Sequence, residues 1–259
     1  MSFEVFETIK INFQKNQESV RQLLDLDRTL LEFCIISIEA LEVKLKSNSE
    51  IQLTNVHFLP SSTLSALKNI RTNDSLRAQY DEMFNQGLVL AVSHFSTAIH
   101  SIFKEAINQA CRCSPDSLTA MNEDIKITFE ELKNYNFDLT ERLGDLLVKK
   151  KDISFQDMQS VHRAFKTFFN LDLERTTNVN NIIFAQAARH SIVHAEGLAD
   201  EKFIKQIKGC ENRTIKQNII PNEKILFSTI EINEIQACMS FYINNLILQL
   251  DLKIGVDPF

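Results

Sequence analysis

Residues 182–197 of this 259-residue chain read IIFAQAARHSIVHAEG, and they indicate its fold class. A helix is predicted from about Asn178 to Ala195, and a helix that is apolar nearly all round is normally buried among other helices. Its exceptions are polar or ionisable: Gln186, Arg189, His190, Ser191 and His194. Gly197 is the expected stop, because glycine readily adopts the left-handed conformation that follows a helix C-terminus. The stretch therefore predicts a buried helix with a small polar cluster at its end.

The composition extends the helical prediction to most of the chain. Hydrophobic residues make up 44% and charged residues 24%, which is typical of a folded globular protein. The chain has only five glycines and four prolines, and none of them comes before Pro60. That is too few for the many tight turns that β-sandwiches, barrels and propellers require. No glycine-rich nucleotide-binding fingerprint occurs either. We expect an all-α helical bundle.

The hydrophobic pattern suggests two parts. From about Phe3 to Lys46 apolar residues recur every three or four positions, with no glycine or proline between them. This run predicts a long helix or a helical hairpin, followed by a turn-rich connector. We expect residues 1–75 to form this N-terminal helical segment with its connector, and residues 76–259 to form a helical domain.

The second part contains one predicted departure from helix. Helices are predicted over residues 84–110, after a cap at Asp200, and from about residue 233 to residue 250. Residues 213–231 are instead β-branched and partly alternating on either side of Pro221. This pattern predicts a small β-hairpin inserted among the helices.

Charge and cysteine usage limit the compartment and the partners. A formal net charge of −6 argues against a polyanion-binding surface over the whole protein, although a local basic patch is compatible with it. The five scattered cysteines, an odd number, are typical of reduced thiols in the cytoplasm. The N-terminus lacks the pattern of a signal peptide, and no apolar run reaches the roughly 18 residues that span a bilayer. We therefore expect a cytoplasmic protein with no membrane partner.

Arg189, His190 and His194 are the candidate catalytic residues. A guanidinium in a buried helix is costly unless a partner or an anion meets it. His190 and His194 are i,i+4 neighbours on one face of that helix. Three interpretations follow from the residues. The side chains are structural, or the two histidines bind zinc, or the arginine binds a phosphate while a histidine moves a proton.

The zinc interpretation has the poorest match to a known pattern. Ser191 occupies the place of the glutamate in the H-E-x-x-H motif, and the sequence implies no third ligand. Cys111 and Cys113 do not complete a standard spacing with the two histidines. We expect no metal and no other cofactor.

The residues RHSIVH at 189–194 resemble the R-polar-x-x-x-H motif of the HEPN superfamily, helical-bundle proteins that include many metal-independent RNases. The phenylalanine-rich run after Ser154, the Glu-Gly pair after Ile-Val-His, and the segment 225–232 leading into the final helix are similar to the RiboL-PSP branch of that superfamily. The resemblance covers roughly residues 78–251. Residues 1–75 have no counterpart in it.

The resemblance implies a metal-independent endoribonuclease that uses the 2′-OH of RNA as nucleophile. Arg189 would hold the phosphate without losing its charge, and His194 would act as base or acid, as histidine does near neutral pH. His190 would orient the phosphate or assist proton transfer. The superfamily also implies a toxin–antitoxin or antiviral defence context, with an antitoxin or defence-system protein as partner. The alternative is a non-catalytic HEPN scaffold or binding module in which Arg189 and His194 are structural.

Two further expectations concern RNA contacts and assembly. Two groups of lysines are candidates for phosphate contacts, with a plain solvated surface as the alternative: Lys149, Lys150, Lys151, Lys202, Lys205 and Lys208. Arg189 and His194 are five residues apart, about 140° around a straight helix, and members of the superfamily join two motifs by dimerising. We therefore expect a homodimer with residues 187–197 of both chains lining a shared cleft and residues 1–46 packing outside it.

Overall fold

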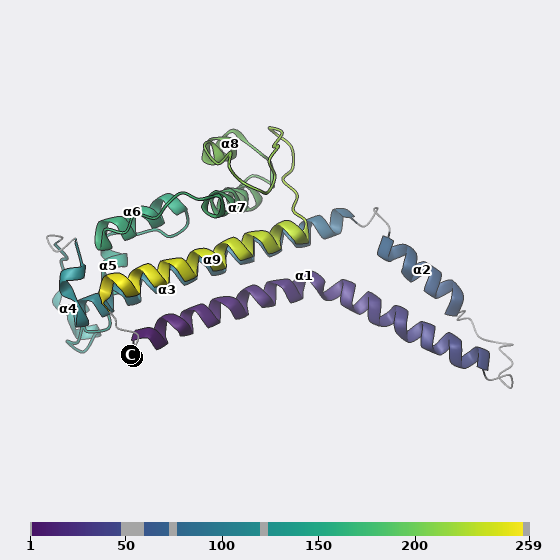
Figure 1. Ribbon diagram of the computed structural model, residues 1–259, viewed down its shortest axis with the longest axis horizontal. Helices are drawn as coiled ribbons and strands as arrows, with labels where there is room; N and C mark the ends of the chain where they lie inside the picture. The colour runs from purple at the N-terminus through teal and green to yellow at the C-terminus, as the bar shows by residue number, and fades with distance from the viewer. Residues whose placement is uncertain (1, 48–59, 73–76, 120–123, 256–259) are drawn as a thin grey trace.

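The computed structural model describes residues 2–47, 60–72, 77–119 and 124–255, and all regular elements within them are helices. The expected all-α class is therefore confirmed. Three long helices lie side by side and form the body of the molecule (Figure 1): α1 (Ser2–Ser47), α3 (Arg77–Cys113) and α9 (Thr229–Ile254). The chain runs in the same direction along α3 and α9 and in the opposite direction along α1. Within the described ranges, no helix combines the length and the apolar character needed to cross a membrane.

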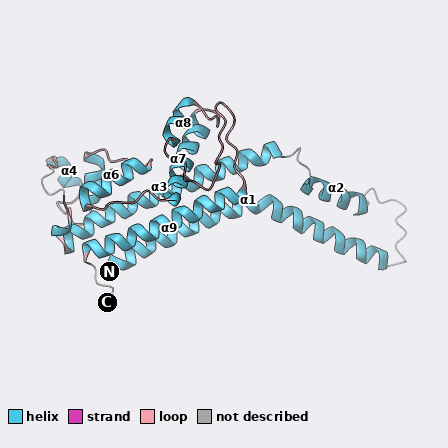
Figure 2. Ribbon diagram, turned by 45° about the horizontal axis from the view of Figure 1, so that its top comes forward, coloured by secondary structure: helices cyan, strands magenta, loops and turns pink. Residues whose placement is uncertain are grey.

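The run from Phe3 to Lys46, predicted as a long helix or a helical hairpin, forms the single helix α1. Phe6, Phe13 and Val20 recur every seven residues along it and are buried in the core with α3 and α9. Beyond Leu24 the helix leaves the body as an arm, defined here as residues 25–47 of α1 together with α2 (Pro60–Thr72) (Figures 1 and 2). The predicted connector thus contains a helix, which packs on the end of α1.

Shorter helices form a second layer on the body. They are α4 (Phe129–Asn134), α5 (Leu143–Lys150), α6 (Met158–Phe169), α7 (Thr177–His194) and α8 (Glu201–Ile207), with a 3-10 turn at Pro115–Ser117. α7 lies across α3 and α9, and α8 packs on α7 (Figures 1 and 2). The late buried helix of the sequence therefore occupies the centre of the second layer.

A cluster of phenylalanine rings fastens α6 and the loop before it to α3. Phe103 of α3 contacts four rings at centroid distances of 5.2–6.1 Å, mostly edge-on, those of Phe155, Phe165, Phe168 and Phe169. The buried Gln186 of α7 accepts a hydrogen bond from the Met158 backbone N–H at 2.9 Å, at the start of α6. Together these contacts place the loop that contains Gln156 beside α7.

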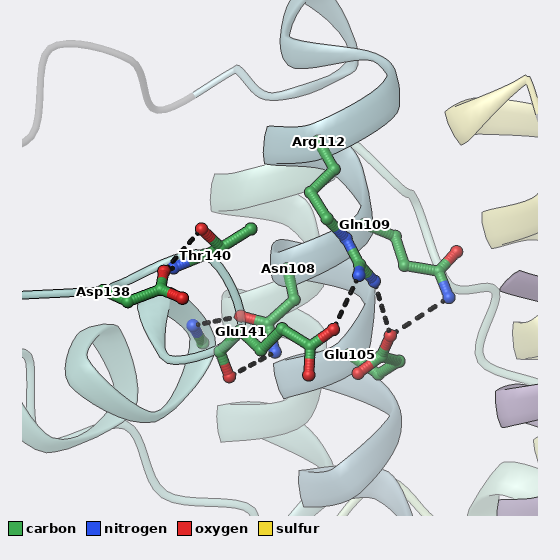
Figure 3. A network of polar contacts seen from close by, with 8 residues as sticks. Glu105, Asn108, Gln109, Arg112, Asp138, Thr140 and Glu141 are labelled. Carbon is green, nitrogen blue, oxygen red and sulfur yellow. Dashed lines mark hydrogen bonds and ion pairs between the residues drawn. The ribbon is translucent and has the colours of Figure 1, made fainter. Parts of the chain in front are cut away.

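Asn108 of α3 anchors the beginning of α5 (Figure 3). Its Nδ2 donates to the Glu141 carbonyl at 3.2 Å, and its Oδ1 accepts from the Gly144 N–H at 2.8 Å. Arg112 bridges Glu105 and Glu141 beside this pair. A Cβ at Gly144 would lie only 2.7 Å from the Cα of Lys104. The two helices thus touch at backbone distance, which requires a glycine.

The β-hairpin expected over residues 213–231 does not form in the described chain. A loop joins α8 to α9, with a single isolated antiparallel bridge between Leu198 and Lys224. The nearly buried guanidinium of Arg213 donates at 2.8–3.1 Å to three carbonyls of the loop, those of Cys210, Lys216 and Gln217. These side-chain bonds take the place of cross-strand partners, so the β-branched pattern reflects burial and not pairing.

Candidate functional site

α7 carries Arg189, His190 and His194 at its C-terminal end. The Thr176 side chain caps the helix by accepting the Val179 N–H, and the middle of the helix is buried, as its apolar pattern predicts. Arg189 and His190 are half-buried, whereas His194 is exposed. The candidate residues therefore lie where a buried helix emerges at the surface.

Ser191 and Gly197 shape the end of α7. The Ser191 carbonyl accepts from the N–H groups of Ala195 and Gly197 at 2.8 and 3.0 Å, and its hydroxyl donates to the Leu198 carbonyl. Gly197 has a φ of +75°, which confirms the predicted stop. Asp200 then caps α8, as expected, by accepting the Phe203 N–H at 2.7 Å. This short turn brings the first turn of α8 against the last turn of α7.

His190, His194 and Lys202 come together across this turn. The two imidazole rings are 4.7 Å apart between centroids, and Nε2 of His190 lies 2.8 Å from Nζ of Lys202. Because a lysine ammonium has only donors, Nε2 must accept and His190 is neutral in this arrangement. Burial lowers the pKa of His190, and the charges of Lys202 and His194 lower it further. His190 is therefore a neutral acceptor that holds an ammonium at the site.

Arg189 faces a different element. Its Nη1 donates to Oε1 of Gln156, in the loop before α6, at 3.1 Å. It forms no ion pair within the part of the chain that the structure describes, and its buried Nε has no hydrogen-bond partner there. An amide oxygen satisfies one donor without neutralising the charge, so the guanidinium keeps its full attraction for an anion.

The predicted divergence of Arg189 and His194 agrees with these contacts. Arg189 reaches the loop before α6, while His190 reaches α8 and His194 lies against His190. A single chain therefore brings the histidines and Lys202 together but directs Arg189 toward Gln156.

The lysines proposed for RNA contacts fall into two separate places. Lys202, Lys205 and Lys208 are exposed on α8 and just after it, close to the end of α7. Lys149–Lys151 lie at the end of α5, away from α8 (Figure 1). Lys150 is held by Glu131 at 2.7 Å, and its hydrogen bond lowers the pKa of that carboxyl to about 2. The α8 lysines are thus the group adjacent to the candidate residues.

Sequence reasoning missed Gln156 and the specific contact of Lys202. Gln156 carries no local signal, because packing of the Phe103 cluster brings it to Arg189. Lys202 had a weak signal: it lies in the first turn after the Asp200 cap, twelve residues beyond His190. Because α8 begins so soon after the end of α7, it has to pack against α7.

Metal ligands do not gather around the two histidines. Among the residues that the structure describes, no group of three or more His, Cys, Asp or Glu side chains is arranged to hold a metal ion. Cys111 and Cys113 lie at the end of α3, and burial raises the pKa of the Cys111 thiol. The zinc interpretation therefore gains no third ligand from this part of the chain.

Comparisons of the chain with models of protein families, with curated proteins and with solved structures found no match. The HEPN resemblance rests on residues 189–194 and their surroundings. The functional inference accordingly depends on the chemistry at the end of α7.

Proposed function

We propose that this protein is a metal-independent endoribonuclease of HEPN type, with Arg189, His190 and His194 as its catalytic residues. The observation that carries the proposal is the cationic end of α7. An arginine without an ion pair in the described chain, an exposed histidine and a lysine-bound histidine lie within two helical turns of one another. Such a cluster attracts a phosphodiester and contains a group that transfers protons near neutral pH.

In the proposed reaction His194 is the base, because it is exposed while Nε2 of His190 is occupied by Lys202. His194 removes the proton of the RNA 2′-OH, and the 2′-oxygen attacks the adjacent phosphorus. The bond from phosphorus to the 5′-oxygen breaks, and that oxygen leaves as a hydroxyl after it takes up a proton from water, while His194 returns its proton to the solvent. The products carry a 2′,3′-cyclic phosphate and a 5′-OH.

Arg189 and Lys202 supply the charge that this reaction needs. The phosphorane gains negative charge on its oxygens, and fixed cations stabilise that charge more than they stabilise the starting phosphodiester. His190 contributes by holding the Lys202 ammonium in place. Lys205 and Lys208 extend the cationic surface along α8 and bind neighbouring phosphates. The Lys149–Lys151 group contacts the RNA only at a distance from the reacting phosphate.

The proposal includes the assembly and the setting that the resemblance implies. Arg189 and His194 diverge on α7, so a homodimer with residues 187–197 of both chains facing each other would complete the site. RNA is the substrate, the cytoplasm is the compartment, and an antitoxin or a defence-system protein is the regulatory partner.

The test is cleavage of an end-labelled RNA by the purified full chain in the presence of EDTA. We expect cleavage that leaves a 2′,3′-cyclic phosphate and a 5′-OH. Arg189→Ala and His194→Ala should each abolish it with an unchanged circular dichroism spectrum. Leu248→Ala, an exposed residue of α9 outside residues 187–197, is the control and should cleave normally. A strict need for a divalent metal, or products with 5′-phosphates, would contradict the mechanism.

A non-catalytic binding module is the second candidate, and one observation favours it. The bond from Arg189 to Gln156 ties α7 to the loop before α6, and the Arg189 Nε is buried, as in a structural arginine. In that case the wild-type chain would bind RNA or a protein without cleaving RNA. Arg189→Ala would then lower the free energy of unfolding, and His194→Ala would change nothing.

A further inference from the structure

The part of α1 that lies in the arm is apolar on two opposite faces, and the described chain covers one of them. Leu31, Ile35 and Ile38 are buried or half-buried on the side of α2. A row of residues on the opposite face, here called the stripe, is exposed: Leu26, Leu30, Phe33, Ile36, Ala40 and Val43. Its large side chains are 52–68% exposed. A helix that is apolar on both faces normally packs against something on both.

We propose that the stripe is a dimerisation surface and that its occupant is the stripe of a second copy of this chain, packed antiparallel. The spacing favours a helical partner. Leu26, Phe33 and Ala40 recur every seven residues, and Ile36 and Val43 repeat with the same period. Two such rows are the a and d positions of a left-handed coiled coil, whose seam has to be filled by another helix.

The antiparallel direction pairs large side chains with smaller ones. If Leu26 lies opposite Val43 of the second copy, Phe33 lies opposite Ile36 of the second copy, and the two-fold axis repeats both pairs. These two layers then have similar volumes, and Ala40 lies opposite Thr29 of the second copy in a smaller layer between them.

Charge favours the same direction. The exposed Asp25 lies at the end of the stripe next to the body, whereas Lys44 and Lys46 are in the last turn of α1. An antiparallel pair brings Asp25 beside the lysines of the second copy. Lys46 is paired with Glu42 of its own helix at 2.7 Å, so a parallel pair would place the two Asp25 residues together and the two Lys44 residues together, which is unfavourable.

The length and area of the stripe also suit a second copy. From residue 25 to Ser47 the helix is about 34 Å long at 1.5 Å per residue, and in the proposed register Ser47 of the second copy reaches residue 22, where the body begins. At about 100 Å² for each of the five large side chains, the pair buries roughly 1,000 Å². That is the lower limit of a specific protein interface.

The first test is the mass of the full chain in solution, measured by sedimentation equilibrium. The double variant Phe33→Glu with Ile36→Glu should have half the mass of the wild type, because it places carboxylates in the seam and raises the dissociation constant at least about a hundredfold. Leu41→Glu, which replaces another exposed leucine on the flank of the same helix, should keep the wild-type mass. Circular dichroism should show equal helix content in all three, since each changed side chain is exposed in the single chain.

The second test is the direction of packing. In a chain whose Cys34, Cys111 and Cys113 are changed to serine, mild oxidation should cross-link a mixture of Leu26→Cys and Val43→Cys chains, and neither chain with itself. A wild-type monomer at every concentration, or equal masses for the wild type and the double glutamate variant, would overturn the proposal. Self-cross-linking of either cysteine variant would overturn the antiparallel arrangement. RNA cleavage is not measured, and the changed stripe residues lie outside residues 187–197, so the difference between the variants is independent both of the proposed ribonuclease activity and of the dimer proposed to complete its site.

Discussion

Nε2 of His190 and Nζ of Lys202 lie 2.8 Å apart and join the last turn of α7 to the first turn of α8. The lysine donates and the imidazole accepts, so a proton on Nε2 would break the contact and place two cations side by side. Burial lowers the pKa of His190, and Lys202 lowers it further. The neutral form of His190 is thus tied to the packing of α8 on α7.

Replacing Lys202 is expected to raise the pKa of His190. In Lys202→Gln the burial effect persists but the nearby charge is lost, so the pKa should move back toward the ordinary value of 6.5. Titration of the ring proton signals by NMR measures the change. Lys205→Gln, an exposed lysine on the same helix, is the control and should leave the titration unaltered. An unchanged pKa in Lys202→Gln would show that the two groups do not interact in solution.

The same contact predicts a pH dependence of stability. The folded pKa of His190 lies below the unfolded value near 6.5, so the unfolded chain binds more protons between the two. The contribution of His190 to the free energy of unfolding is therefore fully present above about pH 6.5, and it is lost as the pH falls from there through the pKa of the folded state. Urea denaturation at each pH measures the free energy of unfolding. Over this pH interval it should fall less in His190→Asn than in the wild type. An identical pH profile would contradict the lowered pKa.

Chains that lack different catalytic residues should complement each other. Arg189→Ala and His194→Ala chains, each inactive alone, form mixed dimers as half of a random one-to-one mixture. Each mixed dimer contains one intact site out of two, so about a quarter of the wild-type cleavage rate should return. A mixture of Arg189→Ala with the double variant Arg189→Ala, His194→Ala is the control and should stay inactive. No recovery after verified chain exchange would rule out a site shared between two chains.

Gly144→Ala should destabilise the fold by about 1–3 kcal/mol, as overpacking typically does. The new Cβ would lie 2.7 Å from the Cα of Lys104, and a helix backbone cannot yield without moving α5 away from α3. Gly87→Ala is the matched control, because its Cβ meets the flexible end of the Leu24 side chain. Urea unfolding of both variants tests this difference. Equal losses at the two positions would contradict the close approach of α3 and α5.

Arg213 is expected to be essential to the loop between α8 and α9. Arg213→Met leaves the carbonyls of Cys210, Lys216 and Gln217 without the guanidinium and should cost about 3 kcal/mol of unfolding free energy. Arg213→Lys keeps the charge but not the planar fork, so it should recover only part of the loss. Lys208→Met, at an exposed position near the loop, should have little effect. Proteolysis within residues 210–217 should quicken in the order wild type, lysine variant, methionine variant.

The helices and their ends followed from the local pattern. The run from Phe3 to Lys46 became α1, Gly197 stopped α7 with a positive φ, and Asp200 capped α8. These features depend on interactions between residues three or four positions apart, so the local sequence is enough to predict them. α2 was missed, because its short turn-rich segment gains its stability from packing on α1.

The hairpin prediction failed at residues 213–231 because alternation records which side chains are buried, not which backbone groups pair. Ile215, Ile225 and Phe227 are buried as the pattern requires. The backbone of this segment is instead held by the Arg213 guanidinium, which donates to the Lys216 carbonyl, and by the bond from the Ile225 N–H to the Gly197 carbonyl. These partners are distant in sequence or belong to a side chain, so the local pattern does not predict them.

Residue types and spacing alone thus established the helical class, the helix that became α7 and the place of Arg189, His190 and His194 at its C-terminal end. Tertiary packing decided their partners: it brought Gln156 to Arg189 across 33 residues and Lys202 to His190 across twelve. It also decided which apolar face of α1 is covered by α2 and which is left open. The physical reason is the range of the forces: helix formation is set by near neighbours along the chain, whereas burial and charge act between all groups that folding brings together.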